Sequence, residues 1–265
     1  MPSIHPTAII DPSAKIADDV VIGPYCIIEN DVEIGSGTRL IANCFIGRNT
    51  TLGSGNKVYP FASLGGDPQD YAYDGTVTYT KIGNNNIFRE GSTVNKATGE
   101  GNETVIGNGC FLMANAHVAH NCKVGNNVIL VAGCLLGGHC RIGDNALISG
   151  LSAVHQFCRV GRMAVLSGVS AISVDLPPFM IGDGRNGGVR SFNIVGLRRN
   201  GFSPETIRTI KKVYDIFFRQ GLSTKNAIEK VEAEVEMLPE VTEFLDFVKS
   251  SKRGILTGDR HGRRS

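Results

Sequence analysis

Apolar residues recur along this chain at every sixth position. Starting at Ile4, each sixth residue is aliphatic through Leu64, and the apolar phase resumes at Ile82 and continues to Ile172 with a single break at Glu100. An amphipathic helix repeats at about 3.6 residues and a half-buried strand at about 2 residues, so neither predicts this spacing over such a length. Short β segments separated by corners do predict it, and the hexapeptide pattern is typical of a parallel β-helix.

The position four residues after each apolar residue also points inward, near a crowded corner of the coil. The side chain at this position should therefore be small. Three six-residue repeats (hexads) close one triangular coil, and successive coils stack about 4.8 Å apart. All seven cysteines occupy this second inward position: Cys26, Cys44, Cys110, Cys122, Cys134, Cys140 and Cys158. We therefore predict that they are small buried residues with free thiols, and neither zinc ligands nor nucleophiles.

Two segments leave the six-residue spacing, although the phase is kept across both. They are residues 65–81 and 95–104. We predict that both are loops ejected from one continuous β-helix that spans residues 1–180. Insertions of this kind often line the functional face of a solenoid.

A different pattern follows the last hexads. Ser203 is a suitable N-cap, Pro204 a suitable first helical residue, and apolar residues from Ile207 onward recur at helical spacing. We predict a small α-helical C-terminal domain over residues 203–252, joined to the β-helix by a connecting segment over 181–202. The basic end of the chain, 253–265, is expected to be a mobile tail.

Charge and hydropathy exclude two classes of partner. The chain has 27 Lys and Arg against 25 Asp and Glu, a formal net charge of +2, which is too small to hold nucleic acid or an anionic membrane non-specifically. The longest weakly polar stretch, 128–138, is too short to span a bilayer. The first residues, MPSIHPTAII, lack the pattern of a secretion signal. We expect a cytoplasmic protein with no nucleic-acid partner and no integral membrane contact.

The candidate chemistry is a group of histidines on the β-helix. Four of the six histidines lie in the uninterrupted run of hexads and off its inward positions: His117, His120, His139 and His155. With three hexads per coil, Gly138 and Gln156 lie in the column of His120. One rung is about 4.8 Å, so one substrate can contact both His120 and His139. A neutral imidazole suits a general base, and it also suits zinc.

Three kinds of function fit an exposed histidine cluster on a β-helix. The first is an enzyme that uses general-base catalysis. The second is a zinc enzyme like the hexapeptide-repeat carbonic anhydrases, but the spacing of His117 and His120 differs from theirs and no nearby residues complete a ligand set, so no metal is expected. The third is a non-enzymatic scaffold that binds its ligand without turnover.

Five stretches resemble one family of acyltransferases. They are 68–75 (PQDYAYDG), 114–122 (ANAHVAHNC), 137–140 (GGHC), 153–161 (AVHQFCRVG) and 193–203 (NIVGLRRNGFS). These motifs resemble UDP-N-acetylglucosamine O-acyltransferase, the first enzyme of lipid A biosynthesis, and the resemblance covers nearly the whole chain. It implies an all-β, left-handed parallel β-helix followed by the helical domain, and a homotrimer with active sites between subunits. The non-enzymatic alternative then becomes a trimeric scaffold that binds a nucleotide sugar without turnover.

The resemblance also implies a reaction and a set of site residues. A 3-hydroxyacyl chain would pass from acyl carrier protein to the 3-position of UDP-N-acetylglucosamine, or of a 3-amino analogue. The chain would arrive on the phosphopantetheine of the carrier protein, so no other cofactor is implied. His120 would be the general base and the N–H of Gly138 would stabilise the oxyanion. Substrate would contact Asp70, Gln69, His117, His139, His155, Gln156, Asn193 and Arg199, and Gly168 would limit the acyl length.

The chain departs from the family pattern at three places. Asn121 stands where the family commonly has Asp after the base, Ala72 where it has Lys, and Val195 where it has Glu. Asn121 carries no charge to stabilise an imidazolium, which predicts that His120 is a weaker base than usual. Because an amine needs less help from a base than a hydroxyl, these departures favour the hypothesis of a 3-amino acceptor.

Overall fold

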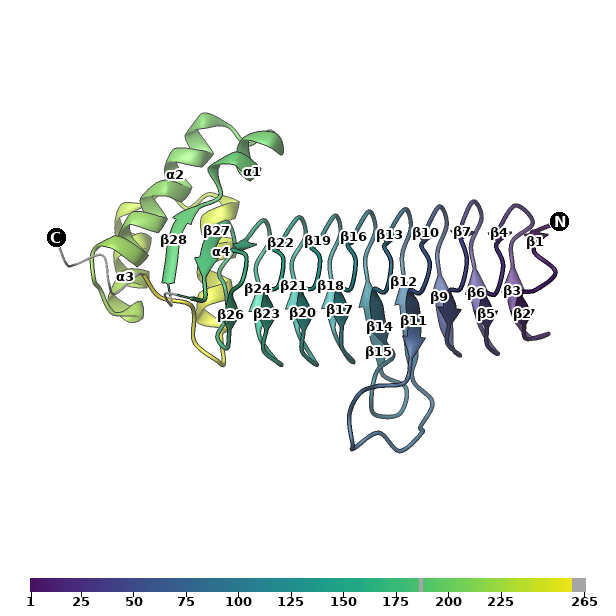
Figure 1. The fold of residues 1–265 in the computed structure, drawn as a ribbon. Coiled ribbons are helices and arrows are strands. Elements are labelled where there is room, and N and C mark those ends of the chain that lie inside the picture. The colour runs from purple at the N-terminus through teal and green to yellow at the C-terminus, as the bar shows by residue number, and fades with distance from the viewer. Residues whose placement is uncertain (186–187, 259–265) are drawn as a thin grey trace.

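Most of the chain forms a long prism of stacked coils. The structure, a computed structural model, describes residues 1–185 and 188–258. Short strands follow one another along the chain, and each pairs in parallel with the strand one coil away to build three sheets; the last strand of the chain, which pairs antiparallel, is the exception. Figure 1 shows the coils stacked along one axis, with the N-terminus at one end and the helices at the other. The fold is the predicted left-handed parallel β-helix with a small helical part at its C-terminal end.

The three sheets are called A, B and C here. Sheet A contains β1 (Ser3–Ile4), β4 (Val21–Ile22), β7 (Arg39–Leu40), β10 (Lys57–Val58), β13 (Ile87–Phe88), β16 (Phe111–Leu112), β19 (Ile129–Leu130), β22 (Leu147–Ile148), β25 (Val165–Leu166), β27 (Met180–Asp183) and β28 (Gly188–Phe192). Sheet B contains β2 (Ile9–Ile10), β5 (Ile27–Ile28), β8 (Phe45–Ile46), β11 (Ser63–Gly66), β14 (Thr93–Asn95), β17 (His117–Val118), β20 (Leu135–Leu136), β23 (Ala153–Val154) and β26 (Ala171–Ile172). Sheet C contains β3 (Lys15–Ile16), β6 (Glu33–Ile34), β9 (Thr50–Leu52), β12 (Tyr79–Ile82), β15 (Glu103–Ile106), β18 (Lys123–Val124), β21 (Arg141–Ile142) and β24 (Arg159–Val160).

The second residue of each two-residue strand points into the prism and the first points out. Ile46, Leu64 and Leu130, all on the predicted apolar phase, have no exposed surface. All seven cysteines are buried and free, as predicted from their shared position. The exception to the pattern is the first coil, where Ile4 is 44% exposed because no earlier coil covers it.

Two different backbone requirements shape the corners. The second turn residue of most corners has positive φ, and asparagine often fills it, as at Asn121 and Asn127 (φ 59° and 53°). Asparagine tolerates this left-handed conformation better than most residues do. Glycine after the inward aliphatic residue meets another need: a Cβ on Gly23 would lie 1.8 Å from the carbonyl oxygen of Ile41 in the next coil.

The corner between sheets C and A is closed by a ladder of side chains, which we call the asparagine ladder (Asn84, Asn108, Asn126 and Asp144). The Oδ1 atom of each accepts the backbone N–H of the equivalent residue one coil earlier. The first bond, from the Ser54 N–H to Asn84, is 2.7 Å long, and those from Asn108 and Asn126 are 2.9 and 2.7 Å. This corner is therefore hydrogen-bonded internally along several coils.

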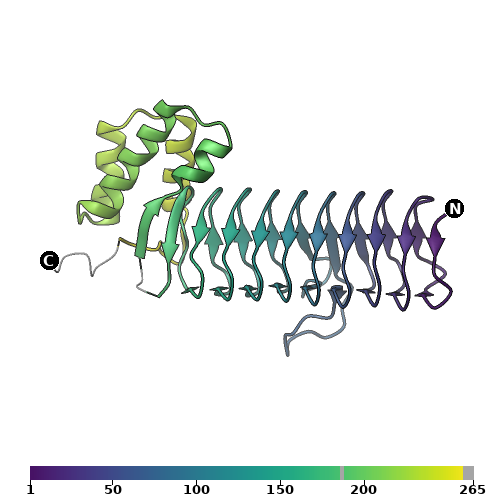
Figure 2. The same ribbon diagram turned by 45° about the horizontal axis from the view of Figure 1, so that its top comes forward.

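Both predicted loops leave the prism at the same corner, the one between sheets B and C. The first runs from the end of β11 to the start of β12, and the second from the end of β14 to the start of β15. The segments outside strands, 67–78 and 96–102, are shorter than predicted because the flanking strands extend into them. The first projects well away from the prism in Figures 1 and 2.

The C-terminal part has more regular structure than the sequence predicted. The predicted connecting segment contains β28, which pairs antiparallel with β27, and the helix α1 (Ile194–Arg199). The remaining helical elements are α2 (Pro204–Tyr214), the π-helical turn η1 (Asp215–Arg219), α3 (Thr224–Glu234) and α4 (Pro239–Lys249). The Ser203 hydroxyl accepts the Thr206 N–H, as its predicted role as N-cap of α2 requires. No helix among the described residues is long and apolar enough to cross a membrane.

The predicted mobile tail begins too early. Residues 253–258 pack against the fold: Ile255 forms a bridge with Asp175, and Gly258 with Val189. Arg253 donates to the Ser173 carbonyl at 3.0 Å. The backbone polar groups of this segment form hydrogen bonds at the end of the prism. Amino-acid composition alone does not predict these bonds. The rest of the predicted tail, 259–265, lies outside the described residues.

Candidate active site

The predicted histidines gather at the corner between sheets B and C, on the coils that follow the two loops. The rings of His120 and His139 meet edge to face with their centres 5.2 Å apart. His139 in turn stacks on Phe157 in the next coil, at 4.6 Å between ring centres. His120 and His139 lie in adjacent columns of the coil stack, and their imidazoles are close enough for one small ligand to touch both.

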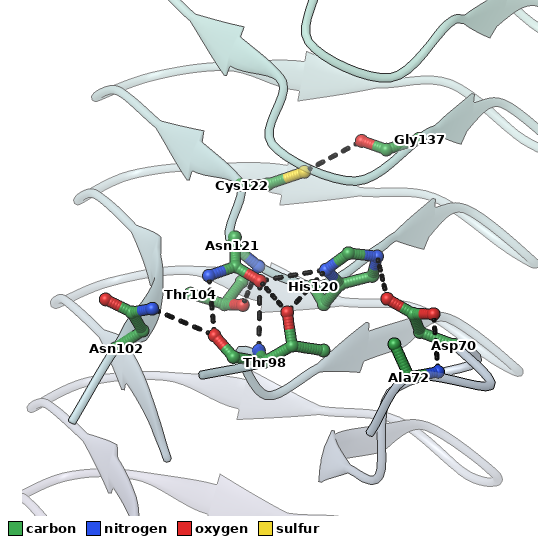
Figure 3. A network of polar contacts seen from close by, with 9 residues as sticks. All are labelled: Asp70, Ala72, Thr98, Asn102, Thr104, His120, Asn121, Cys122 and Gly137. Carbon is green, nitrogen blue, oxygen red and sulfur yellow. Dashed lines mark hydrogen bonds and ion pairs between the residues drawn. The ribbon is translucent and has the colours of Figure 1, made fainter. Parts of the chain in front are cut away.

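The Nδ1 atom of His120 faces the side chain of Asn121. Asn121 Oδ1 lies 2.8 Å from this nitrogen and also accepts the backbone N–H of Thr98 at 2.9 Å. The Asn121 amide nitrogen donates to the Thr98 carbonyl at 3.1 Å (Figure 3). Since a backbone N–H can only donate and a carbonyl can only accept, the orientation of the Asn121 amide follows from these contacts.

This orientation determines which nitrogen of His120 carries a proton. An oxygen that faces Nδ1 at hydrogen-bond distance requires an N–H there, because two acceptors do not bond. The neutral ring then has its lone pair on Nε2, which lies 3.7 Å from Oδ2 of Asp70, in the first loop (Figure 3). His120 is therefore held in the tautomer that a base acting through Nε2 needs.

Gly138 lies directly against His120, one coil away. A Cβ built on Gly138 would be 2.5 Å from His120 Nε2, so a side chain at 138 would collide with the imidazole. Within the described residues, the Gly138 N–H has no hydrogen-bond partner. Glycine thus provides both the space for the imidazole and an accessible backbone donor beside its free nitrogen.

The two neighbouring imidazoles are held neutral. Burial lowers the pKa of His117 below its usual value of 6.5, with a smaller contribution from nearby His120. Burial and His120 also lower the pKa of His139, against a smaller opposing effect of Asp70. Thr93 Oγ1 lies 2.7 Å from His117 Nδ1 and fixes that ring. At neutral pH both rings are uncharged hydrogen-bonding groups.

A groove of about 860 Å³ runs from this corner along the outer face of sheet B. Its polar end contains six of the predicted site residues: Gln69, His117, His120, Gly138, His155 and Gln156. Its floor farther along is apolar and is built from Leu135, Ala153, Ala171 and Ile172. The arrangement suits a ligand with a polar head and an alkyl chain. His155 is also 3.4 Å from Arg253, which connects the end of the chain to the groove.

Three predicted site residues lie elsewhere in this chain. The Asn193 side chain caps α1, accepting the Gly196 N–H at 2.9 Å and donating to the Met163 carbonyl at 2.8 Å. Arg199 is exposed in the last turn of α1, which lies on the side of the prism away from the first loop (Figure 1). Gly168 lies at the corner between sheets A and B, where a Cβ would have room. One chain alone does not bring these three residues to the groove.

Sequence reasoning missed two residues next to the site. Thr98 holds Asn121, and Lys96 lies buried beneath the first loop. Both belong to the second ejected segment, where the six-residue spacing gives no information about side-chain direction. As for metal, the described part of the chain contains no group of three or more His, Cys, Asp or Glu side chains that could hold an ion.

Two family models match the chain. One, described as UDP-N-acetylglucosamine O-acyltransferase, domain 2, matches residues 175–256. The other, described as bacterial transferase hexapeptide, matches residues 1–36 and 103–138. The first covers the end of the prism with the helices, and the second covers parts of the coils.

Curated relatives match over nearly their whole length. A protein of Thermodesulfovibrio yellowstonii named acyl-[acyl-carrier-protein]–UDP-N-acetylglucosamine O-acyltransferase is 47% identical over 256 residues, which are 96% of this chain and 99% of the relative. One of the same name from Trichlorobacter lovleyi is 50% identical over 260 residues, 97% of this chain and 100% of the relative.

Solved structures agree with these sequence matches. A UDP-N-acetylglucosamine acyltransferase from Bacteroides fragilis superimposes with a TM-score of 0.92 at 40% identity, over 95% of this chain and 99% of the other. The enzyme of Francisella novicida gives a TM-score of 0.92 at 38% identity, over 97% of this chain and 95% of the other. At this identity and coverage the similarity extends from the fold to the sequence.

Proposed function

The chain belongs to the UDP-N-acetylglucosamine O-acyltransferase family, and from this premise we propose that it acylates a UDP-amino sugar by general-base catalysis at His120. The reaction transfers a 3-hydroxyacyl chain from acyl carrier protein to the 3-position of UDP-N-acetylglucosamine, the first step of lipid A biosynthesis. The observation that carries the mechanism is the free Nε2 of His120 beside Gly138, at the polar end of a groove with an apolar floor.

The chemical step follows from this geometry. Nε2 of His120 takes the proton from the sugar 3-hydroxyl as that oxygen attacks the thioester carbonyl. The Gly138 N–H stabilises the negative charge that develops on the carbonyl oxygen. The tetrahedral intermediate collapses by breaking the C–S bond, and the protonated His120 returns the proton to the leaving thiolate. The acylated sugar and the free phosphopantetheine thiol are the products.

The acceptor depends on the partner of His120. Asn121 selects the tautomer but contributes no negative charge to an imidazolium, so no carboxylate supports the base on its Nδ1 side; the Asp70 carboxylate lies on the Nε2 side, 3.7 Å away. A 3-amino sugar is a better nucleophile and needs less of this help. Because Asn121 is a neutral partner of His120, the 3-amino analogue of UDP-N-acetylglucosamine is a second candidate acceptor.

A homotrimer would complete the site. The outward row of sheet A is apolar and half-buried over five coils, at Ile87, Phe111, Ile129, Leu147 and Val165. The outward row of sheet C over the same region carries Lys123, Arg141 and Arg159. An apolar face beside a charged one fits self-association with closed symmetry. A neighbouring subunit would then supply Asn193 and Arg199 to the nucleotide phosphates.

Subunit mixing tests this arrangement. His120→Ala and Arg199→Ala homo-oligomers should each be inactive or weakly active, whereas mixed oligomers should regain part of the activity because some sites receive both intact residues. The product is measured after mixing, unfolding and refolding together. No recovery in verified mixed oligomers would contradict a site shared between subunits.

The carrier protein has a candidate docking surface on the helical part. Arg198, Arg208 and Lys211 rim a groove of about 360 Å³ whose floor includes Phe192 and Phe202. Positive charge around an apolar floor suits an acidic carrier protein. The acyl chain then arrives on phosphopantetheine and no other cofactor is required.

The seven free thiols fit a reducing compartment, so we propose that the reaction takes place in the cytoplasm.

The decisive assay offers the protein several 3-hydroxyacyl carrier proteins together with either UDP-N-acetylglucosamine or its 3-amino analogue. Mass spectrometry should detect an acylated UDP sugar for one acyl length in preference to others, and the preferred sugar identifies the acceptor. Gly168 predicts tolerance of a long chain. Binding of UDP sugar without any acylated product would support a non-enzymatic scaffold and contradict the proposal.

A further inference from the structure

Lys96 is a buried charged residue that the mechanism does not use. Its side chain is 2% exposed, and its Nζ lies 2.5 Å from Oδ1 of Asp67. The same ammonium group lies 5.5 Å from the centre of the Tyr73 ring, over its face. Lysine is rarely buried without such partners. Both partners belong to the first loop, whereas Lys96 follows directly after β14.

Further contacts tie the same loop down. The Lys96 N–H donates to the Gly66 carbonyl at 3.0 Å, and Asn95 Nδ2 donates to the Asp67 carbonyl at 2.9 Å. Arg48, one coil below, lies 3.7 Å from Asp67 Oδ1 and 3.5 Å from the Tyr73 hydroxyl. The loop is thus held at both ends of the stretch from Asp67 to Tyr73.

The residues between these two ties are the ones that face the site. Gln69 lines the groove, and Asp70 lies 3.7 Å from His120 Nε2. The Tyr73 N–H donates to the Asp70 carbonyl at 3.1 Å, and the Ala72 N–H donates to the Asp70 carboxylate at 3.0 Å. The position of Asp70 therefore depends on where Tyr73 and Asp67 are held.

The segment 95–98 also reaches the other side of His120. Two residues after Lys96, the Thr98 backbone and hydroxyl hold the Asn121 amide. One short stretch of chain thereby fixes the base on its Nδ1 side and the loop carboxylate on its Nε2 side. A rigid connection of this kind keeps two groups that contact the same substrate at a constant separation.

We propose that Lys96 is a positioning residue: the ion pair between its buried ammonium group and Asp67 holds Gln69 and Asp70 in place for the sugar nucleotide. The proposal rests on the proposed function in taking a UDP sugar as the ligand. Lys96 does not reach the substrate. It acts through Asp70, and it acts on acceptor binding more than on the chemical step.

The test uses Lys96→Met and Asp67→Asn, with Lys81→Met as the matched control. Lys81 also forms an ion pair, with Glu103 at 2.8 Å, but it is half-exposed and holds no loop. Both test variants should raise the KM for UDP-N-acetylglucosamine roughly tenfold, while kcat changes less than about threefold. The KM for acyl carrier protein and all parameters of the control should stay unchanged.

A double-mutant cycle separates positioning from general loss of structure. In an Asp70→Ala background, Lys96→Met should add little further increase in KM, since the contact through which it acts is already gone. Full additivity of the two changes would overturn the proposal. If Lys96→Met does not fold, Asp67→Asn carries the test, because the Asp67 side chain is 64% exposed and its replacement leaves no cavity.

Loop order gives a readout that does not depend on activity. Tyr71 is fully exposed at the tip of the first loop. Cleavage after Tyr71 by chymotrypsin, identified by mass spectrometry, should be several times faster in Lys96→Met than in the wild type or in Lys81→Met. Unchanged cleavage together with unchanged KM would overturn the proposal. Faster cleavage in a protein that forms no acylated sugar would leave the positioning role intact and refute only the proposed reaction.

Discussion

Two corners of the same prism use the same backbone turn for different purposes. The corner between sheets C and A and the corner between sheets B and C both place asparagine at positive φ, at Asn127 and Asn121. At the first, the asparagine ladder satisfies the backbone N–H groups coil after coil. At the second, the described structure leaves the Gly138 N–H without a partner, beside the imidazole of His120.

Since both corners share this backbone turn, the turn alone does not create a binding site. At the first corner, the ladder side chains accept the backbone N–H groups of Ser54, Asn84, Asn108 and Asn126. At the other corner, ejected loops replace the two preceding turns, and imidazoles stand beside the amides of Asn121 and Gln156. There the Gly138 N–H and His120 Nε2 stay open to substrate. Changes at the first corner should affect stability, whereas changes at the second should affect catalysis.

The largest effect should come from removing the base. His120→Ala should lower kcat about 1000-fold, within the range for loss of a general base, because it removes the imidazole whose Nε2 lies against Gly138. The Kd for UDP-N-acetylglucosamine, measured by calorimetry, should change less than about threefold. A variant that retains wild-type kcat would show that another group is the base.

A methyl group at Gly138 should have the next largest effect. Gly138→Ala places a Cβ 2.5 Å from His120 Nε2, so the ring or the backbone must shift, and kcat should fall about 100-fold. The matched variant is Gly125→Ala at the other corner, where the new Cβ would meet Asp144 Oδ1 at 2.3 Å. It should lower the melting temperature and leave kcat near wild type. If both variants lost activity to the same extent, the proposed difference between a catalytic and a structural corner would be wrong.

The coils and the adjacent columns of His120 and His139 could be predicted because each six-residue repeat carries its own signal. An inward residue such as Leu130 and a small one such as Cys134 repeat in register, and the column of His120 follows from counting residues. The contacts of Thr98 and Lys96 could not be predicted in this way. Their segment leaves the spacing, and their partners lie more than 20 residues away in the chain, at Asn121 and Asp67.

The resemblance predicted more of the site than one chain displays. Asn193 and Arg199 were expected at the nucleotide phosphates, but in this chain the Asn193 amide is used to cap α1. Their roles stay predictions, because this chain alone does not bring them to the groove. Residues 253–258 form isolated bridges with Asp175 and Val189, and Arg253 contacts His155; composition alone predicts none of these contacts.

Breaking the asparagine ladder should have a smaller effect, confined to stability. Asn126→Ala removes the acceptor of the Asn108 N–H and should lower the free energy of unfolding by about 1 kcal/mol. The value is measured by urea unfolding, and kcat should remain within about twofold of wild type. A large loss of kcat without loss of stability would mean that the two corners are not independent.

The smallest effect concerns the dependence of stability on pH. His117 and His139 have lowered pKa values, so the unfolded chain binds more protons than the folded one between those values and 6.5. Stability should therefore fall as the pH drops below about 6.5 and level off below the folded-state values. His117→Gln should make this decline shallower, as thermal unfolding across pH 5 to 7 would show. An identical decline in the variant would exclude His117 as a contributor.

The central claim is that Asn121 and His120 act as a pair in the chemical step. Its most direct test is the pH profile of kcat/KM for the wild type, Asn121→Asp and Asn127→Asp. A carboxylate beside Nδ1 favours the protonated imidazole, so the acidic limb of the Asn121→Asp profile should move to higher pH by roughly one unit. The same substitution at the ladder corner, Asn127→Asp, should leave the limb where it is. No movement with Asn121→Asp, or equal movement with both, would contradict the account.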